Sequence, residues 1–187
     1  MTEPVRRVVV LGAESTGSTT LARALAEHFS CPYVPEYGRD YTWERPGTIH
    51  TPWKTVEFEH IADVQNQLED AAARDTGNGW VICDTDAFST VLWHERYMGF
   101  YAPTVQAISD QQARPFARIL TGDDIPFEQD GIRDGEAIRH AMQARFREEL
   151  RKTDVPWIEV RGSVAQRLAD SLAFLDQLRA DRNLSTG

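Results

Sequence analysis

Apolar and polar positions alternate along this chain in a pattern that predicts strands and helices in turn. Residues at helical spacing predict helices at 19–29, 55–74, 88–101 and 104–112, and two more beyond residue 136. Strands alternating with helices indicate an α/β fold, in which a parallel sheet is covered by helices on both faces. Short apolar runs predict the buried strands, at Val8–Leu11, Tyr33–Val34, Trp80–Cys83, Phe116–Leu120 and Trp157–Val160.

Two segments show neither the helical spacing of apolar residues nor an apolar run. Residues 39–54 are rich in aromatic residues, Pro and Gly, and are predicted to form a functional loop or lid. The polar, acidic segment Gly122–Gly135 is predicted to form a second one. Ser163 followed by Gln166 predicts a capping box at the start of the last helix. We expect one domain over residues 1–187, with residues 181–187 as a fraying tail.

The segment from Val8 to Leu25 carries the clearest chemical signal. Gly12 and Gly17 have the spacing of the phosphate-binding P-loop, G-x-x-x-x-G-K-[ST], between a predicted strand and a predicted helix. The loop amides and the helix N-terminus would face an anion such as a triphosphate. Thr19 stands at the position of the Mg²⁺-binding hydroxyl, whereas Ser18 replaces the lysine. The predicted nucleotide-binding residues are Gly12, Glu14, Ser15, Thr16, Gly17, Ser18, Thr19 and Thr20. An ordinary glycine-containing turn is the alternative.

Acidic residues follow the predicted strands at the edge where parallel strands end together. Glu36 follows the second strand, and Asp84 and Asp86 follow the third. Beside a triphosphate, one acid can bind Mg²⁺ and another can accept the proton of an attacking hydroxyl. Asp84 is therefore predicted to serve as a metal ligand or base. The alternative is a cap for the next helix, a role that suits Asp86 better.

Two further clusters suggest contacts with a substrate. Tyr37 and Tyr41 offer stacking faces for a planar ring, and Arg39 lies between them to hold a phosphate or to order the loop. Arg133 lies in the second polar loop, where it could close onto the transferring phosphoryl group. A salt-bridged turn and a surface turn are the respective alternatives. The predicted substrate-binding residues are Tyr37, Arg39, Tyr41 and Asp86, and the predicted catalytic residues are Glu36, Asp84 and Arg133.

Composition and net charge exclude several classes of binding partner. The chain has 187 residues, 41% of them hydrophobic, and a net charge of -9, which argues against a nucleic-acid backbone as partner. Two cysteines are too few for a disulfide framework, and Cys83 is expected to be a buried apolar residue. No apolar run approaches the roughly 20 residues of a membrane span, and no signal peptide precedes the first strand. We expect a soluble cytoplasmic protein with a small-molecule partner.

Four motifs together resemble a known family. Residues 12–17, Glu36–Arg39, Asp84–Asp86 and Asp130–Arg133 have the order and spacing found in the ribosylnicotinamide kinase domain of the NadR proteins, a resemblance that covers Val8 to about Leu178. It implies a P-loop kinase fold of nucleoside-kinase type. It also implies ATP- and Mg²⁺-dependent phosphorylation of the 5′-hydroxyl of nicotinamide riboside. By the same resemblance, residues 14–19 would cradle phosphates, Thr19 and Asp84 would serve Mg²⁺, Glu36 or Asp84 would be the base, and Arg133 would belong to the lid.

Ser18 is the main departure from the family pattern, because it removes a positive charge from the P-loop. Arg133, Arg39 and Lys54 are the residues predicted to be able to replace that charge. A nucleotide-binding sensor and an ATPase of another purpose therefore remain as alternative functions. Because the chain starts a few residues before the first strand, we expect the kinase part alone, without adenylyltransferase or helix-turn-helix parts. The acceptor nucleoside and the oligomeric state stay open, a homo-oligomer included.

Overall fold

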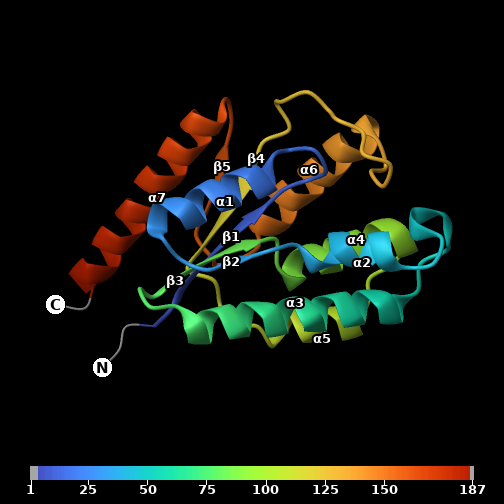
Figure 1. The fold of residues 1–187 in the computed structure, drawn as a ribbon, viewed down its shortest axis with the longest axis horizontal. Coiled ribbons are helices and arrows are strands. Elements are labelled where there is room, and N and C mark those ends of the chain that lie inside the picture. Colours follow the sequence, from blue (N-terminus) through green and yellow to red (C-terminus); the bar gives the residue numbers. More distant parts are fainter. Residues whose placement is uncertain (1–3, 186–187) are drawn as a thin grey trace.

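The computed structural model describes residues 4–185. Five parallel strands form one sheet in the order β2-β3-β1-β4-β5 (Figure 1). The pairing register places Val10 opposite Asp84 on one side and Ile119 on the other, so β1 lies at the centre. The strands are β1 (Arg6–Leu11), β2 (Tyr33–Val34), β3 (Trp80–Asp84), β4 (Ala117–Thr121) and β5 (Trp157–Val160). The predicted α/β fold with an all-parallel sheet is confirmed.

Helices cover both faces of this sheet (Figure 1). Alternate residues of β1 pack in opposite directions: Val8 and Val10 face α1 and α7, whereas Val9 and Leu11 face α6 and part of α4. A third apolar cluster joins α3, α4 and α5. The helices are α1 (Ser18–Phe29), α2 (Tyr37–Glu44), α3 (Thr55–Asp75), α4 (Ala87–Met98), α5 (Pro103–Asp110), α6 (Glu136–Leu150) and α7 (Val164–Ser185), with the short 3-10 turn η1 (Thr48–His50). None of the helices within the described part is long and apolar enough to span a membrane.

Residues 39–54 differ from the sequence prediction, because much of this segment is helical. Helix α2 occupies Tyr37–Glu44, and its first amide, Tyr37 N, donates to the buried Gln65 Oε1 at 3.0 Å. After the helix, the guanidinium of Arg45 donates to the backbone carbonyls of Thr51 and Pro52 at 3.0 and 3.3 Å. These long-range partners order a segment whose composition alone is typical of a loop. Residues 122–135, by contrast, form the predicted polar loop without helix or strand.

The last helix also differs from the prediction at both ends. Only half of the predicted capping box forms: Ser163 Oγ accepts from Gln166 N at 3.2 Å, but the Gln166 side chain donates to Asp170. Helix α7 then continues to Ser185, past Arg182, where we expected the chain to fray. Residues 186–187 lie outside the described residues.

Candidate active site

The P-loop lies where β1 passes into α1, and short-range contacts fix its shape. Gly17 has φ +83°, a left-handed conformation that suits glycine, and Ser18 begins the helix. Thr16 Oγ1 donates to Ala13 O at 2.7 Å and lies 2.8 Å from Thr121 Oγ1 at the end of β4. A Cβ on Gly12 would stand 2.4 Å from that same Thr121 oxygen, so only glycine fits there. All eight predicted nucleotide-binding residues line one pocket of about 600 Å³.

Two arginines that the sequence analysis did not single out hold the outer side of this loop. Arg167 of α7 is 3% exposed; its Nη1 donates to Thr16 O, and its Nη2 contacts Asp124 Oδ1 at 2.8 Å. Arg139 of α6 is 2% exposed and donates to Ile125 O at 2.8 Å and to Ser15 O at 3.4 Å. Both guanidinium groups therefore lie behind the phosphate-binding loop and bind its backbone carbonyls. Their positions in helices give no motif that could have revealed them.

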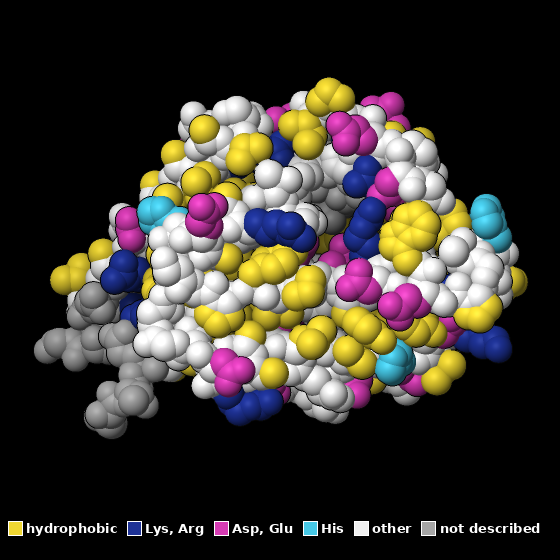
Figure 2. Space-filling view, in the orientation of Figure 1, with side chains coloured by type: hydrophobic (Ala, Val, Ile, Leu, Met, Phe, Trp, Pro, Cys, Tyr) yellow, Lys and Arg dark blue, Asp and Glu magenta, His cyan; other side chains and the backbone are white. Residues whose placement is uncertain are grey.

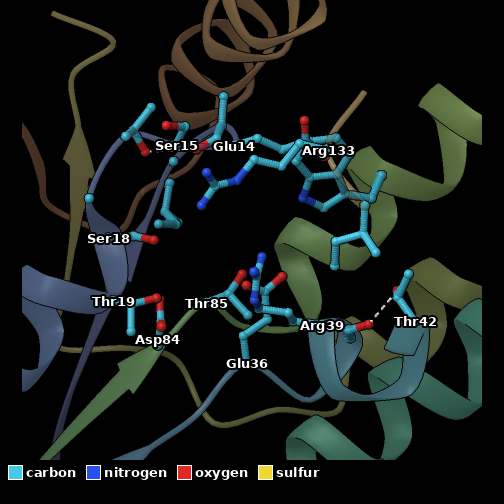
Figure 3. Close-up of a pocket in the computed structure, with 18 of the residues that line it drawn as sticks. Glu14, Ser15, Ser18, Thr19, Glu36, Arg39, Thr42, Asp84, Thr85 and Arg133 are labelled. Atoms are coloured by element: carbon cyan, nitrogen blue, oxygen red, sulfur yellow. Dashed lines mark hydrogen bonds between the residues drawn. The ribbon is translucent and has the colours of Figure 1, made fainter. Parts of the chain in front are cut away.

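Asp84 and Glu36 face the same pocket from neighbouring strand ends, as Figure 3 shows. Asp84 ends β3 and is 2% exposed; its Oδ2 accepts from Tyr33 OH at 3.2 Å, while Oδ1 is buried with no hydrogen-bond partner among the described residues. Burial raises the pKa of Asp84, although the neighbouring hydroxyl groups of Thr19, Tyr33 and Ser18 oppose the shift. Burial and the nearby Asp84 charge raise the pKa of Glu36 to about 8, against the opposing effect of Arg39.

Figure 3 shows the Thr19 hydroxyl next to the Asp84 carboxylate, one oxygen of which, Oδ1, has no hydrogen-bond partner among the described residues. A carboxylate oxygen and a hydroxyl oxygen are hard ligands of the kind that Mg²⁺ takes, and Mg²⁺ sites usually complete their shell with phosphate oxygens and water. These two residues therefore fit the predicted metal site. A cation there would also favour the charged form of both carboxylates.

Arg39 and Arg133 reach the pocket from opposite walls and share one carboxylate. Arg39 of α2 donates to Asp130 Oδ2, and Arg133 Nε lies 3.3 Å from the same oxygen. Arg133 also donates to the Glu128 carbonyl in its own loop. These ion pairs lower the pKa of Asp130 against the effect of its burial. Both predicted arginines thus line the pocket, whereas Lys54, the third residue considered for the missing charge, does not.

Residues 122–135 are tied directly to the P-loop. Glu128 N donates to Ser15 Oγ at 2.8 Å, and Asp134 N donates to Glu14 Oε2 at 2.8 Å. Burial, with repulsion from Asp134, raises the pKa of Glu14 to about 7. The side chains of Glu14 and Ser15 are therefore used to bind this loop, which we name the lid loop. Figure 2 shows the hollow beneath it, with basic and acidic side chains around the rim.

Three predicted substrate-binding residues do not line the pocket. Tyr37 OH contacts His60 Nε2 at 3.0 Å near the surface, and Tyr41 OH donates to Glu57 Oε1 at 3.2 Å. Asp86 is 3% exposed: it caps α4 by accepting from Ser89 N, and its Oδ2 accepts from Arg118 at 3.0 Å. In a helix beginning at residue 37, these tyrosines point along the outer face instead of into the pocket. The alternative reading of Asp86 as a helix cap is confirmed.

Other aromatic residues line the pocket in their place. Trp53 contacts Phe58 and Tyr97 at ring-centroid distances of 5.0 and 5.4 Å, and the Arg45 guanidinium lies 3.9 Å from its ring centroid. The indole nitrogen of Trp53 is buried with no hydrogen-bond partner in residues 4–185. The aromatic pocket residues are Trp53, Phe58, Trp93 and Tyr97, and the aliphatic ones include Ile61 and Ile132. The aromatic content of residues 39–54 was the only sequence signal for Trp53.

With the geometry established, comparisons with known proteins identify the family. The model of the AAA domain family matches residues 7–167, most of the chain. The chain belongs to the AAA domain family. The chain is also 31% identical to the trifunctional NAD biosynthesis/regulator protein NadR of Salmonella typhimurium, over 159 residues that make up 84% of this chain. The aligned part is 38% of that relative, so the chain spans well under half of the relative's length. The resemblance to NadR proteins predicted from four motifs is confirmed.

Solved structures of other proteins share the fold. A NadR protein crystallised in complex with NR matches with a TM-score of 0.71 at 20% identity, covering 93% of this chain and 51% of that one. The thymidylate kinase of Candida albicans matches with a TM-score of 0.72 at 12% identity, covering 96% and 94% of the two chains. At such identities the likeness shows the fold, here that of P-loop nucleoside and nucleotide kinases.

Proposed function

We propose that this protein is a cytoplasmic kinase that transfers the γ-phosphoryl group of ATP to the 5′-hydroxyl of nicotinamide riboside. One observation carries the proposal: the buried carboxylate of Asp84 and the half-buried carboxylate of Glu36 share a pocket with a P-loop. A protein that only senses a nucleotide has no need of a base with a raised pKa next to the phosphate site. Similarity to the NadR proteins supports the choice of acceptor.

The acceptor side of the pocket suits a planar, positively charged base. Nicotinamide riboside carries a pyridinium ring, and such a cation is attracted to aromatic faces like those of Trp53, Trp93 and Tyr97. Glu36 and Asp84 add negative charge nearby when ionised. A neutral purine or pyrimidine nucleoside would gain only the stacking part of this interaction. We therefore propose a preference for the cationic nucleoside.

In the proposed reaction, the acceptor hydroxyl oxygen attacks the γ-phosphorus, and the bond from that phosphorus to the β,γ-bridging oxygen breaks as ADP leaves. Glu36 accepts the proton of the attacking hydroxyl. The P-loop amides at the start of α1 bind the phosphates, and Arg133 stabilises charge on the transferring group. Thr19 and Asp84 would hold Mg²⁺, which when bound neutralises phosphate charge.

Ser18 supports a second function, a nucleotide-binding module without turnover. A lost cationic donor typically costs on the order of 3 kcal/mol, about a hundredfold in rate, because phosphoryl transfer depends on electrostatic stabilisation. Nucleotide binding through the loop amides does not need the lysine charge to the same degree. Arg39 and Arg133 both line the pocket, and either can supply the positive charge that the P-loop lacks. Their presence favours the kinase over this alternative.

A panel of nucleosides incubated with ATP, Mg²⁺ and the protein, with ADP release as the readout, separates these functions. ADP that depends on nicotinamide riboside supports the proposal, provided that Glu36→Gln abolishes most of it. ADP release without any acceptor indicates an ATPase. ATP binding measured by calorimetry, with no ADP under any condition, indicates the nucleotide-binding module.

A further inference from the structure

Thr85 has a backbone conformation that threonine rarely adopts. Its φ is +70°, in the left-handed region, where a β-branched side chain clashes with its own backbone. Glycine or asparagine would adopt this conformation at less cost. Strained residues of this kind tend to occur at functional sites, where the surrounding structure holds them in place. The presence of threonine instead of glycine or asparagine at this position therefore suggests a role for its side chain.

The neighbours of Thr85 explain why the backbone must turn there. Asp84 is still paired in the sheet opposite Val10, and Thr85 N donates to Val10 O at 2.7 Å. One residue later, Asp86 is already the extended N-cap of α4 and accepts from Ser89 N at 3.2 Å. A single residue therefore joins the end of a strand to the start of a helix. This geometry accounts for the positive φ, but it does not account for a hydroxyl-bearing, β-branched side chain.

The Thr85 side chain is directed into the active-site pocket. It lines the pocket together with Glu36, Arg39 and Asp84, and Figure 3 shows these residues around one cavity. Within residues 4–185, the Thr85 hydroxyl has no hydrogen-bond partner, whereas the hydroxyls of Thr16 and Thr42 around the same pocket donate to backbone carbonyls at 2.7 Å. A hydroxyl that is held in a strained position and left unpaired beside the reactive carboxylates is available to a ligand.

We propose that Thr85 is a substrate-contacting residue whose Oγ1 forms a hydrogen bond with the sugar of the acceptor nucleoside. This inference rests on the proposed nucleoside kinase function and identifies a contact for its acceptor. Thr85 follows Asp84 directly and faces the half of the pocket that contains Glu36, so its hydroxyl acts on the acceptor instead of the adenine end of ATP. A bound sugar hydroxyl would be held with its neighbouring 5′-hydroxyl near the base.

The test measures acceptor and nucleotide binding separately by calorimetry, with a non-hydrolysable ATP analogue present when nicotinamide riboside is titrated. Thr85→Val keeps the shape but removes the hydroxyl, and should weaken acceptor binding about tenfold, the usual upper range for one neutral hydrogen bond. Thr85→Ser keeps the hydroxyl and should stay within about threefold of wild type. Affinity for the ATP analogue alone should change less than twofold in both variants.

Thr48 offers a matched control, because it is a second threonine with positive φ, +48°, and does not line the pocket. Thr85→Gly and Thr48→Gly both relieve strain, which offsets the entropy that glycine adds to the unfolded chain. Both variants should therefore melt at or above the wild-type temperature. Only Thr85→Gly should lose acceptor affinity, which separates a binding role from a folding role.

The outcomes distinguish this inference from the proposed function. Acceptor affinity within twofold of wild type in Thr85→Val overturns the inference, as does weakening of the ATP analogue instead of the acceptor. If the wild-type protein binds nicotinamide riboside but releases no ADP, the kinase function is overturned. The acceptor affinity of Thr85→Val then still decides whether Thr85 contacts the nucleoside. A wild-type protein that binds no nucleoside of the panel overturns both.

Discussion

The pocket has two walls that are built in different ways. The wall that we propose binds the nucleotide, here called the nucleotide wall, is a short continuous segment, Gly12–Thr20, whose shape depends on backbone conformation and small side chains. The acceptor wall is assembled from α2, α3, α4 and the segment before α3, with large aromatic side chains such as Trp53 and Trp93. The first wall follows a local spacing rule, whereas the second depends on which faces of three helices meet. The same pocket therefore combines a part that is readable from sequence with a part that is not.

This difference also predicts how each wall responds to substitution. Backbone amides cannot be removed by changing a side chain, so the nucleotide wall is vulnerable mainly where a new Cβ changes the backbone. The acceptor wall consists of side chains, so single truncations should remove part of the binding energy without removing the site. Substitutions in both walls test this view, in decreasing order of expected effect.

Gly17→Val should abolish ATP binding in a protein that still folds. A valine at φ +83° is strained, and its side chain would meet Arg167 Nη1 and Ile125, whose distances from an added Cβ are 3.4 and 3.5 Å. The loop must then shift, so its amides no longer converge on the phosphates. Calorimetry with an ATP analogue measures the loss, and circular dichroism checks the fold. Gly77→Val is the control, because a Cβ there meets nothing within 4 Å. Unchanged affinity in folded Gly17→Val would exclude this loop as the nucleotide site.

Arg133→Ala should lower turnover by roughly three orders of magnitude, the range for an arginine that acts on the transferring phosphoryl group. Ser18→Lys should partly rescue it, because both changes act on one charge deficit and are expected to be non-additive. Steady-state ADP release of the two single variants and the double variant measures the coupling. Arg114→Ala, on an exposed arginine paired with Asp154, serves as control. If Arg133→Ala is silent, Arg39 becomes the cation to test next.

Glu36→Gln and Asp84→Asn should each lower turnover at least about a hundredfold, with ATP binding in the absence of Mg²⁺ nearly unchanged. Glu36 is the residue just before helix α2, and Glu44 is the exposed last residue of that helix, so Glu44→Gln is the control for Glu36→Gln. Wild-type turnover in both variants would show that these carboxylates are structural and that the proposed mechanism is wrong.

The raised pKa of Glu36 adds a pH dependence with a defined sign. In the free enzyme, a base with a pKa of about 8 loses its active, charged form tenfold per pH unit below that value, so kcat/KM should rise from pH 6 to 8. Stability should follow the opposite course. The folded protein keeps this proton up to about pH 8, while the unfolded chain releases it near 4.5, so stability is lost as pH rises between those values. Thermal unfolding of Glu36→Gln should show a shallower pH slope than wild type.

Trp53→Leu should weaken acceptor binding about tenfold and leave ATP binding unchanged, since it removes a stacking face from the acceptor wall alone. Tyr37→Phe, by contrast, removes only the hydroxyl that contacts His60 and should leave both affinities within twofold. Acceptor titrations of the two variants provide the comparison. A larger effect of Tyr37→Phe than of Trp53→Leu would restore the sequence-based prediction and contradict the observed orientation of α2.

The sequence predicted the sheet, most helices and the P-loop turn because each depends on local patterns. β1 is an apolar run, Gly12 and Gly17 have a fixed spacing, and Asp84 follows a buried strand directly. Helix α2 was missed because it depends on partners distant in sequence, such as Gln65. Without that helix, the direction of Tyr37 and the inward position of Trp53 could not be deduced. Arg139 and Arg167 escaped notice because a buried arginine in a helix leaves no periodic signal.

Those two arginines fix the backbone of the loop that we propose binds the nucleotide. Arg167 binds the carbonyl of Thr16, and Arg139 binds that of Ser15, both from outside the loop. Since a trans peptide is planar, each fixed carbonyl turns the N–H group of the next residue to the opposite side. The loop is thus shaped before a ligand arrives, and binding loses little conformational entropy in ordering it. A chain that lacks the P-loop lysine can in this way recover part of its affinity through preorganisation.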